Sequence, residues 1–207
     1  MNKTKKKIIV AAVSLFNENG MNNIRNQDIA AAAGISLSNF NYHFKTKQDL
    51  VHAVFAYMVE VLKEQVYGNK VLIQEGQGLE ITKAYFKFEK NFRFFYLDTH
   101  NILQTYPELK EGFQKQIKEA ILIIKNLNYI AIGKGLMMPE PIPGLYDQLA
   151  EQIWVNNHFW FAQIQIRGEE KATVRKGMET CYTILYPYLT EKGRHNYKEY
   201  LENLLID

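Results

Sequence analysis

Polar side chains that can hydrogen-bond to base edges cluster in one short stretch, residues 36–43 (SLSNFNYH). If this stretch is helical, Phe40 and Phe44 lie four residues apart and can bury together. The outer face is then uncharged, polar and aromatic, which suits a helix whose N-terminal half enters the DNA major groove. Taken singly, each polar residue is equally well explained as a solvated surface group. The candidates for contact with DNA here are Ser36, Leu37, Ser38, Asn39, Asn41, Tyr42 and His43.

The segment before this stretch has the pattern of a partner helix and a tight turn. Ile29 and Ala33 fall four residues apart on one helical face, and the alanines between them allow a second helix to approach closely. Gly34 ends that helix, because glycine adopts the left-handed conformation at little cost, and Ser36 is placed to cap the next helix. Residues 26–50 therefore predict two short helices joined by a turn, followed by the start of a third.

Positive charge is concentrated beside this motif. Residues 1–52 hold seven lysine or arginine residues and three acidic ones, a net charge of +4, whereas the rest of the chain sums to −1. This distribution is expected if only the first segment meets phosphate. Arg25 and Gln27 stand at or just before the start of a helix, where backbone amides favour phosphate. The basic residues 3–7 either lie along the phosphate backbone or form a solubilising tail.

Three linked motifs occur in order between Ile9 and Leu50: AAVSLFNENG, DIAAAAGIS and NYHFKTKQDL. With these motifs the chain resembles the TetR/AcrR family of bacterial transcriptional regulators. The resemblance implies that Lys47 binds a backbone phosphate; the structural alternative is a surface lysine without a role.

The chain departs from the family pattern at two places. Arg25, Asn26 and Gln27 stand where a Thr-apolar-Arg sequence is common, so which of them touches a base is open. Asn41 replaces the usual tyrosine, while Tyr42 and His43 match, so Tyr42 is expected to supply the missing phosphate contact.

The predicted fold is all-α: an N-terminal three-helix helix-turn-helix domain (1–50) joined to a C-terminal helical bundle (51–207), about nine to ten helices in total. With 47% apolar and 13% aromatic residues the chain can bury a substantial core. The fourth helix is expected over 47–66, with a break at 68–69 and another at 76–78. Further expected features are a Pro107 helix start, a loop at 133–144, helices over 145–167 and 172–190, and a last helix over 194–205.

The second half is rich in aromatic residues, and the resemblance implies that it encloses an inducer pocket and dimerises through 145–167 and 172–190. A cavity for an apolar or flat ligand and simple filling of the core are both compatible with the pattern. Candidate pocket residues are Phe88, Phe92, Tyr96, His100, Phe113, Trp154, His158 and Tyr182. Candidate dimer-interface residues are Trp160, Phe161, Ile164, Met178 and Leu185.

Several other classes of protein lack support in the sequence. There is no glycine-rich phosphate loop, nucleophile elbow or facing carboxylate pair, so no enzymatic activity and no cofactor are expected. Asp98, His100 and His158 have side chains that could act as ligands, but no cluster has metal spacing. The basic start and short apolar run lack a cleavage site, no run could span a bilayer, and the single Cys181 fits a reducing cytoplasm.

We therefore expect a cytoplasmic homodimer that binds a roughly palindromic double-stranded DNA operator and represses transcription until an unidentified small-molecule inducer binds. Dimer symmetry would place two recognition helices about 34–36 Å apart in successive major grooves. The alternatives are an architectural DNA-binding protein that senses nothing, a transcriptional activator, and an all-α enzyme, for which polar groups would have to converge on a cleft.

Overall fold

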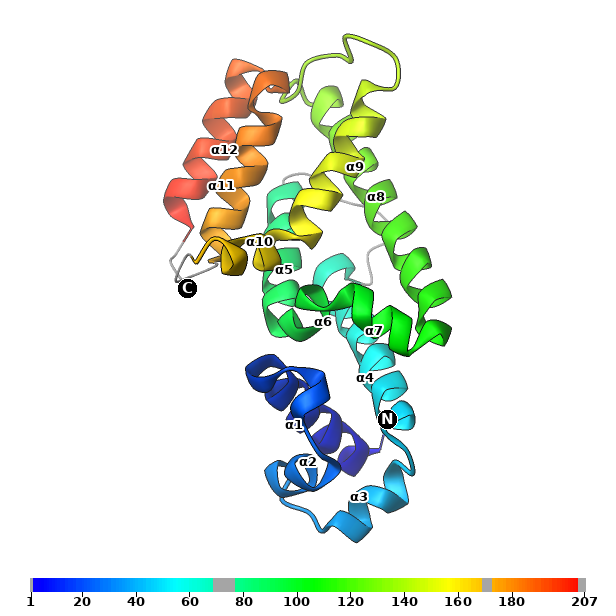
Figure 1. The fold of residues 1–207 in the computed structure, drawn as a ribbon. Coiled ribbons are helices and arrows are strands. Elements are labelled where there is room, and N and C mark those ends of the chain that lie inside the picture. Colours follow the sequence, from blue (N-terminus) through cyan, green and yellow to red (C-terminus); the bar gives the residue numbers. More distant parts are fainter. Residues whose placement is uncertain (1, 69–76, 169–172, 205–207) are drawn as a thin grey trace. The chain divides into compact units, whose positions relative to one another are not determined.

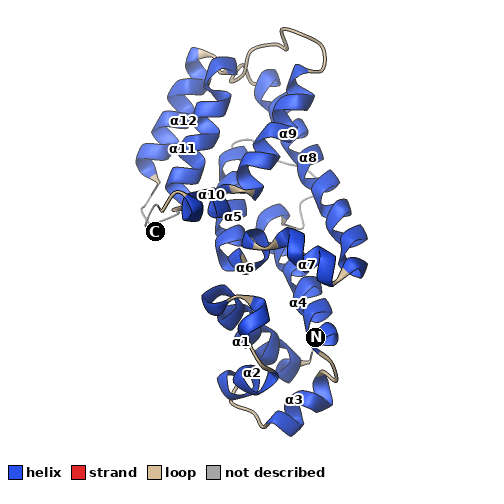
Figure 2. Ribbon diagram, in the orientation of Figure 1, coloured by secondary structure: helices blue, strands red, loops and turns tan. Residues whose placement is uncertain are grey.

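The computed structural model describes residues 2–68, 77–168 and 173–204, and these ranges contain twelve α-helices and no strand (Figures 1 and 2). The chain divides into two compact units, which are described separately. Unit 1 comprises residues 1–69 and 88–110, and unit 2 comprises residues 70–87 and 111–207. The all-α prediction is confirmed.

Unit 1 contains the N-terminal helices and a returning pair of short helices. They are α1 (Lys3–Asn19), the 3-10 helix η1 (Met21–Asn23), α2 (Asn26–Ala32), α3 (Leu37–His43), α4 (Lys47–Val61), the π-helix η2 (Leu62–Tyr67), the end of α5 (Gln77–Asn91), α6 (Arg93–Leu97), α7 (Thr99–Thr105) and the 3-10 helix η3 (Pro107–Leu109). The expected fourth helix is thus α4 continued by η2, and Pro107 starts a helical segment as predicted.

Aromatic packing joins the two segments of unit 1. The ring of Phe16 on α1 meets Phe94 on α6 edge-on, with centroids 5.4 Å apart, and Phe55 on α4 lies 5.9 Å from Phe95. Asn17 adds polar contacts, because its Oδ1 accepts from the free amide of Phe94, at 3.0 Å, at the start of α6. Residues 88–110 therefore form part of the scaffold that positions α1 and α4.

Unit 2 is a helical bundle built from the C-terminal part of the chain and the first part of α5. Its further elements are α8 (Lys110–Gly133, whose first residue belongs to unit 1), α9 (Leu145–His158), α10 (Trp160–Ile166), α11 (Val174–Leu185), the 3-10 helix η4 (Tyr186–Tyr188) and α12 (Glu191–Asn203). One core cluster surrounds Phe86, Trp160 and Met178, and a second surrounds Met137 and Tyr146.

Close backbone approach in unit 2 depends on Gly193 at the start of α12. A Cβ at Gly193 would lie 1.9 Å from the Leu136 carbonyl oxygen, a distance that no side chain allows. The same stretches of backbone are tied by Thr190, whose amide donates to Leu136 O at 3.1 Å and whose hydroxyl caps α12 by accepting from Gly193 N. The last helix therefore begins at Glu191, three residues earlier than predicted.

The structure has more and shorter helices than the nine or ten that the sequence predicted. Breaks occur at Phe92, Asp98 and Phe159, where no proline or glycine marks the sequence. At Phe92 the broken helix gains the cap from Asn17, a partner distant in sequence. The predicted breaks at 68–69 and 76–78, the start of the helix expected at 172 and the predicted end at 205 lie wholly or partly outside the described residues.

Candidate nucleic-acid interface

The turn between α2 and α3 has the geometry that the sequence predicted. Gly34 adopts a left-handed conformation with φ of +61°, and the amide of Ile35 donates to Ala30 O at 3.0 Å across the turn. Ser36 caps α3, because its Oγ accepts from the amide of Asn39 at 3.1 Å. The backbone at the start of α3 is thus fixed by local hydrogen bonds.

The two faces of α3 differ sharply in exposure. Phe40 is fully buried and Phe44 nearly so, and their rings lie 5.9 Å apart against the rest of unit 1. The burial predicted for this pair is therefore confirmed. On the opposite face Tyr42 is 81% exposed. Exposed candidate residues are Arg25, Gln27, Ser36, Leu37, Ser38, Asn39, Asn41 and Tyr42, whereas His43 and Lys47 are half-buried.

The polar groups of this outer face are open to an external partner. Within the described part of the chain, the side chains of Ser38, Asn39 and Asn41 form no hydrogen bond with the protein. Their donors and acceptors are satisfied by solvent, which a base edge or phosphate can replace. The outer face of α3 is therefore chemically suited to groove contact.

Lysine side chains from the first turns of α1 border the helix-turn-helix motif. The Lys5 ammonium lies 5.8 Å from the centre of the Phe44 ring, and a Cβ at Gly34 would lie 3.4 Å from Lys7 Nζ. Asn2, Lys5, Tyr42 and His43 line an open groove of about 700 Å³. The basic N-terminal residues and the end of α3 thus belong to one surface.

Lys47 has an environment that the sequence did not reveal. Its ammonium donates to the carbonyl oxygens of Ile24 at 2.6 Å and Met21 at 3.2 Å, and it lies 5.0 Å from the centre of the Phe16 ring. Burial lowers the pKa of Lys47, while the nearby Asp28 carboxylate opposes that shift. The ammonium therefore ties the start of α4 to the connection between α1 and α2, and its binding to phosphate stays a prediction.

A second set of residues that sequence reasoning missed holds α4. Glu108 Oε1 accepts from Gln48 Nε2 at 2.7 Å and lies 2.6 Å from His52 Nε2. The backbone hydrogen bond of Glu108, followed by the His52 contact, lowers the pKa of the Glu108 carboxyl. At its N-terminus, α4 is capped by Thr46 and Asp49 in a reciprocal capping box. Only the Thr46-to-Asp49 spacing could have been read from the sequence.

The candidate pocket residues are divided between the two units. Phe88, Phe92 and Tyr96 are buried in unit 1, where they pack in an aromatic cluster with ring centroids 5.0 to 6.2 Å apart. His100 is exposed. Tyr182 packs in the core of unit 2, 4.8 Å from the Tyr197 ring. Phe88, Phe92, Tyr96 and His100 thus belong to unit 1 and the other four candidates to unit 2, and the pocket that they were expected to line stays a prediction.

Three of the candidates do meet in unit 2. The imidazole of His158 stacks on Trp154 with centroids 5.0 Å apart and lies 5.6 Å from the ring of Phe113. His158 is 3% exposed, and burial lowers its pKa to about 4, so the ring is neutral at pH 7. We call Phe113, Trp154 and His158 the aromatic cluster of α8 and α9. Its three rings are uncharged at pH 7; those of Trp154 and His158 are stacked, and that of Phe113 is tilted by 45° against His158.

Most of the candidate dimer-interface residues are buried within the single chain, and their role in a dimer stays a prediction. Trp160, Phe161, Ile164 and Met178 are buried in the core of the single chain, and Leu185 packs against it. The first four therefore have little accessible surface, whereas Leu185 is half-buried. The amphipathic pattern identified buried positions but could not tell burial within one chain from burial between two. The large apolar side chains that are exposed in this region are Val155 on α9, Ile166 on α10 and Phe159 between the two helices.

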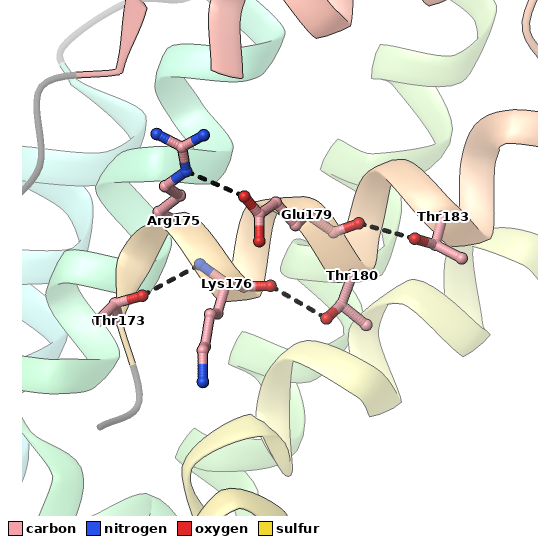
Figure 3. Close-up of polar contacts among 6 residues, drawn as sticks. All are labelled: Thr173, Arg175, Lys176, Glu179, Thr180 and Thr183. Atoms are coloured by element: carbon pink, nitrogen blue, oxygen red, sulfur yellow. Dashed lines mark hydrogen bonds and ion pairs between the residues drawn. The ribbon is translucent and has the colours of Figure 1, made fainter. Parts of the chain in front are cut away.

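The outer polar residues of α11 bond within their own helix (Figure 3). Thr180 Oγ1 donates to Lys176 O and Thr183 Oγ1 donates to Glu179 O, both at 3.0 Å. Arg175 Nε lies 2.9 Å from Glu179 Oε1, and Thr173 caps the helix by accepting from Lys176 N. This face is therefore polar and largely self-satisfied, unlike that of α3.

Two features are absent from the described residues. Within residues 2–68, 77–168 and 173–204, His, Cys, Asp and Glu side chains do not gather in groups of three or more that could hold a metal ion. Over the same ranges, every helix is too short or too polar to cross a membrane.

Comparison with known proteins identifies the class to which this fold and interface belong. Residues 8–54 match the family model described as "Bacterial regulatory proteins, tetR family", and residues 73–197 match the model described as "Bacterial transcriptional repressor". The chain therefore belongs to the TetR family of transcriptional regulators, DNA-binding proteins of the repressor type. Regulators of this family are generally not enzymes.

Individual relatives are more distant. The chain is 28% identical over 145 residues to the uncharacterized HTH-type transcriptional regulator YerO of Bacillus subtilis, a match covering 66% of this chain but only 49% of YerO. A TetR-family regulator from Marinobacter aquaeolei has the same fold, with a TM-score of 0.82 and 22% identity over 98% of both chains. A regulator from Saccharomonospora viridis, solved in complex with choline, has a TM-score of 0.66 and 14% identity over 100% of both chains.

Proposed function

We propose that this chain is a homodimeric repressor that binds a two-fold symmetric DNA operator through α3 and the first turns of α1, and that a small molecule bound in unit 2 releases it. A cytoplasmic location is part of the same proposal. The observation that carries the DNA-binding step is the exposed, uncharged face of α3 with its unpartnered polar groups, bordered by Lys5 and Lys7.

The two kinds of residue would have different tasks. Asn39 and Asn41 can donate and accept at base edges, so they would contribute sequence preference. Lys5, Lys7 and Tyr42 would contact phosphates and contribute affinity without reading sequence. Lys47 would support DNA binding indirectly: its ammonium holds the connection before α2 against the start of α4.

The proposed DNA contact is tested by gel retardation of the DNA that flanks the chain's own gene, at moderate salt with competitor DNA. Replacing Lys5 and Lys7 with glutamine should weaken binding to all sequences and make the salt dependence shallower by about 0.9 for each phosphate that is no longer neutralised. The matched control is Lys63→Gln on η2, an exposed lysine outside this surface. An unchanged salt slope in the double variant would contradict the proposed surface.

We further propose that the dimer forms through the exposed apolar residues of α9 and α10. Val155 is 47% exposed and Ile166 is 86% exposed, and large apolar side chains at such positions mark association surfaces. A two-fold interface uses the same patch on both copies, so one substitution removes two contacts. This proposal keeps the dimer on 145–167, one of the two segments that the family resemblance implied, but on different side chains.

Light scattering after size-exclusion chromatography tests this surface. Val155→Asp with Ile166→Asp should shift the protein from dimer to monomer and weaken operator binding. The matched control is Leu122→Asp, at another exposed apolar position, on α8. A monomer produced by Leu122→Asp, with a dimer retained in the α9 and α10 variant, would place the interface elsewhere.

The sensing step rests on the described interior of unit 2 and on the family. The choline complex of the Saccharomonospora viridis regulator shows that a protein of this fold can hold a small molecule. In this chain a ligand that binds one conformer of the dimer better would shift the population towards it, and a conformer with mismatched recognition helices would leave the operator.

A further inference from the structure

Two buried hydrogen-bond donors in unit 2 lack an acceptor. Gln116 on α8 is 8% exposed and Trp160 on α10 is 5% exposed, and neither Gln116 Nε2 nor Trp160 Nε1 has a hydrogen-bond partner among the described residues. Leaving a buried donor without an acceptor is unfavourable, so buried polar groups are seldom left without a partner. These two positions therefore point to an acceptor supplied from outside the chain.

Gln116 belongs to the surroundings of the aromatic cluster. It lies three residues after Phe113 on the same face of α8, and residues at that spacing are neighbours on a helix surface. Phe113 is in turn 5.6 Å from the His158 ring, which stacks on Trp154. The Gln116 amide thus lies one helical turn from a group of three flat rings.

A third unpartnered donor is too distant to belong to the same small site. Asn128 Nδ2 also lacks an acceptor among the described residues. It lies twelve residues further along α8, which corresponds to about 18 Å of helix. A ligand of ordinary size at the aromatic cluster would not reach it, so Asn128 is left out of the inference.

Charge is absent from this interior. In the described part of unit 2 the buried polar side chains are the amides of Gln116, Asn128 and Asn157 and the imidazole of His158. None of them carries a charge at neutral pH, given the low pKa of about 4 for His158. A carboxylate or ammonium moved here from water would lose its hydration without gaining an opposite charge.

We propose that Gln116 and the aromatic cluster of α8 and α9 form a site for an uncharged, flat ligand that carries an oxygen acceptor, such as a carbonyl or ester. The rings of Phe113, Trp154 and His158 supply apolar surface for the flat part. Gln116 Nε2 donates to the oxygen, and Trp160 Nε1 is a second donor in the same unit. The inference rests on the proposed function in treating unit 2 as the sensor.

The test uses four probes that share a benzene ring and differ in polarity: methyl benzoate, benzoate, benzyltrimethylammonium and propylbenzene. Trp154 and Trp160 are the two tryptophans of the chain, so intrinsic fluorescence of the full-length protein reports on the site without DNA. Methyl benzoate should change the emission saturably, with an affinity at least about tenfold higher than that for benzoate or the quaternary ammonium.

The variant that identifies the donor is Gln116→Leu, which keeps the shape and removes the amide. It should weaken methyl benzoate binding roughly five- to tenfold and leave propylbenzene binding unchanged. The fold should survive, because replacing an unsatisfied buried amide by an apolar group of similar shape is neutral or stabilising. Gln114→Leu, at an exposed position on the same helix, is the matched control.

Three results would overturn the inference: no saturable response to methyl benzoate up to about 1 mM, benzoate or the ammonium binding as tightly as the ester, or Gln116→Leu leaving the preference for the ester over propylbenzene unchanged. Gel retardation of the same samples separates the two proposals. Operator binding without probe binding refutes the ligand site alone, and probe binding without operator binding refutes the proposed repressor function alone.

Discussion

The outer face of α3 in unit 1 and the outer face of α11 in unit 2 differ in how their polar groups are satisfied. On α3 the side chains of Ser38, Asn39 and Asn41 point to solvent. In unit 2 the outer residues of α11 bond to their own helix, and the donors without acceptors, such as Gln116 Nε2, lie inside. An exposed set of free groups suits a large external partner, and a buried one suits a small enclosed molecule. The difference supports the proposal that unit 1 binds DNA and that unit 2 binds a ligand.

The largest expected effect is on operator affinity, when matched pairs of alanine substitutions on the outer faces of α3 and α11 are compared. Asn39→Ala with Tyr42→Ala should lower operator affinity roughly 100- to 1,000-fold, because a dimer makes each of the two contacts twice. Thr180→Ala with Thr183→Ala on α11 should change it by less than about twofold, since those hydroxyls donate to their own helix. Fluorescence anisotropy with labelled operator measures both. Equal losses of affinity in the two pairs would remove the distinction between the faces.

The interior of unit 2 should make stability depend on acid. The folded pKa of His158 is about 4, below the value of 6.5 for a free imidazole, so between these pH values the unfolded chain binds more protons. The contribution of the neutral His158 to the free energy of unfolding is therefore at its full value above pH 6.5. It falls by on the order of 3 kcal/mol as the pH drops to 4. Urea titrations should show this fall reduced in His158→Phe.

The exposed His195 provides the control for this measurement, because its side chain is 83% accessible. His195→Gln should keep the acid dependence of the parent chain. If His158→Phe kept it as well, the buried imidazole would not be its source, and the description of an uncharged interior would fail.

A smaller effect is expected for the half-buried ammonium of Lys47 in unit 1. Lys47→Met removes the donor for the carbonyl oxygens of Met21 and Ile24 and should lower the free energy of unfolding by about 1 to 2 kcal/mol. Lys63→Met, at an exposed site on η2, should have little effect. Urea denaturation compares the two. A Lys47 variant with parental stability and weakened operator binding would favour the phosphate role over the structural one.

The smallest expected effect isolates the helix caps. Ser36→Ala on α3 and Thr173→Ala on α11 each remove a side-chain acceptor for an amide at the helix start and should cost about 1 kcal/mol of stability. Only Ser36→Ala should also weaken operator binding, since α3 carries proposed DNA contacts and α11 carries none. Thermal melting measures the stability and fluorescence anisotropy the operator affinity of the same samples. A loss of operator binding in Thr173→Ala as large as that in Ser36→Ala would contradict the assignment of DNA contacts to α3 and not to α11.

Local patterns predicted the parts of the structure that depend on neighbouring residues. The spacing of Phe40 and Phe44 gave the buried side of α3, and the Gly34 and Ser36 pair gave the turn and cap. These features follow from helix periodicity and from hydrogen bonds within a few residues. They were sufficient to predict the helix-turn-helix motif.

Features that depend on distant partners could not be predicted in this way. The Lys47 side chain turns inward because its ammonium donates to carbonyl groups more than twenty residues away in the sequence. After the helix break at Phe92, Asn17 accepts the hydrogen bond of a free amide at the start of α6. The residues expected to form the dimer, such as Trp160 and Met178, fill the core of one chain. A helical stripe shows that a face is covered but not by what.

The most direct test of the proposed DNA face is hydrogen exchange of the full chain, measured by mass spectrometry with and without the operator. If α3 and the first turns of α1 contact DNA, the operator should slow amide exchange in peptides covering residues 36–43 and 2–7, with no comparable slowing in 174–185. Exchange in residues 36–43 that is the same with and without bound operator would contradict the central claim.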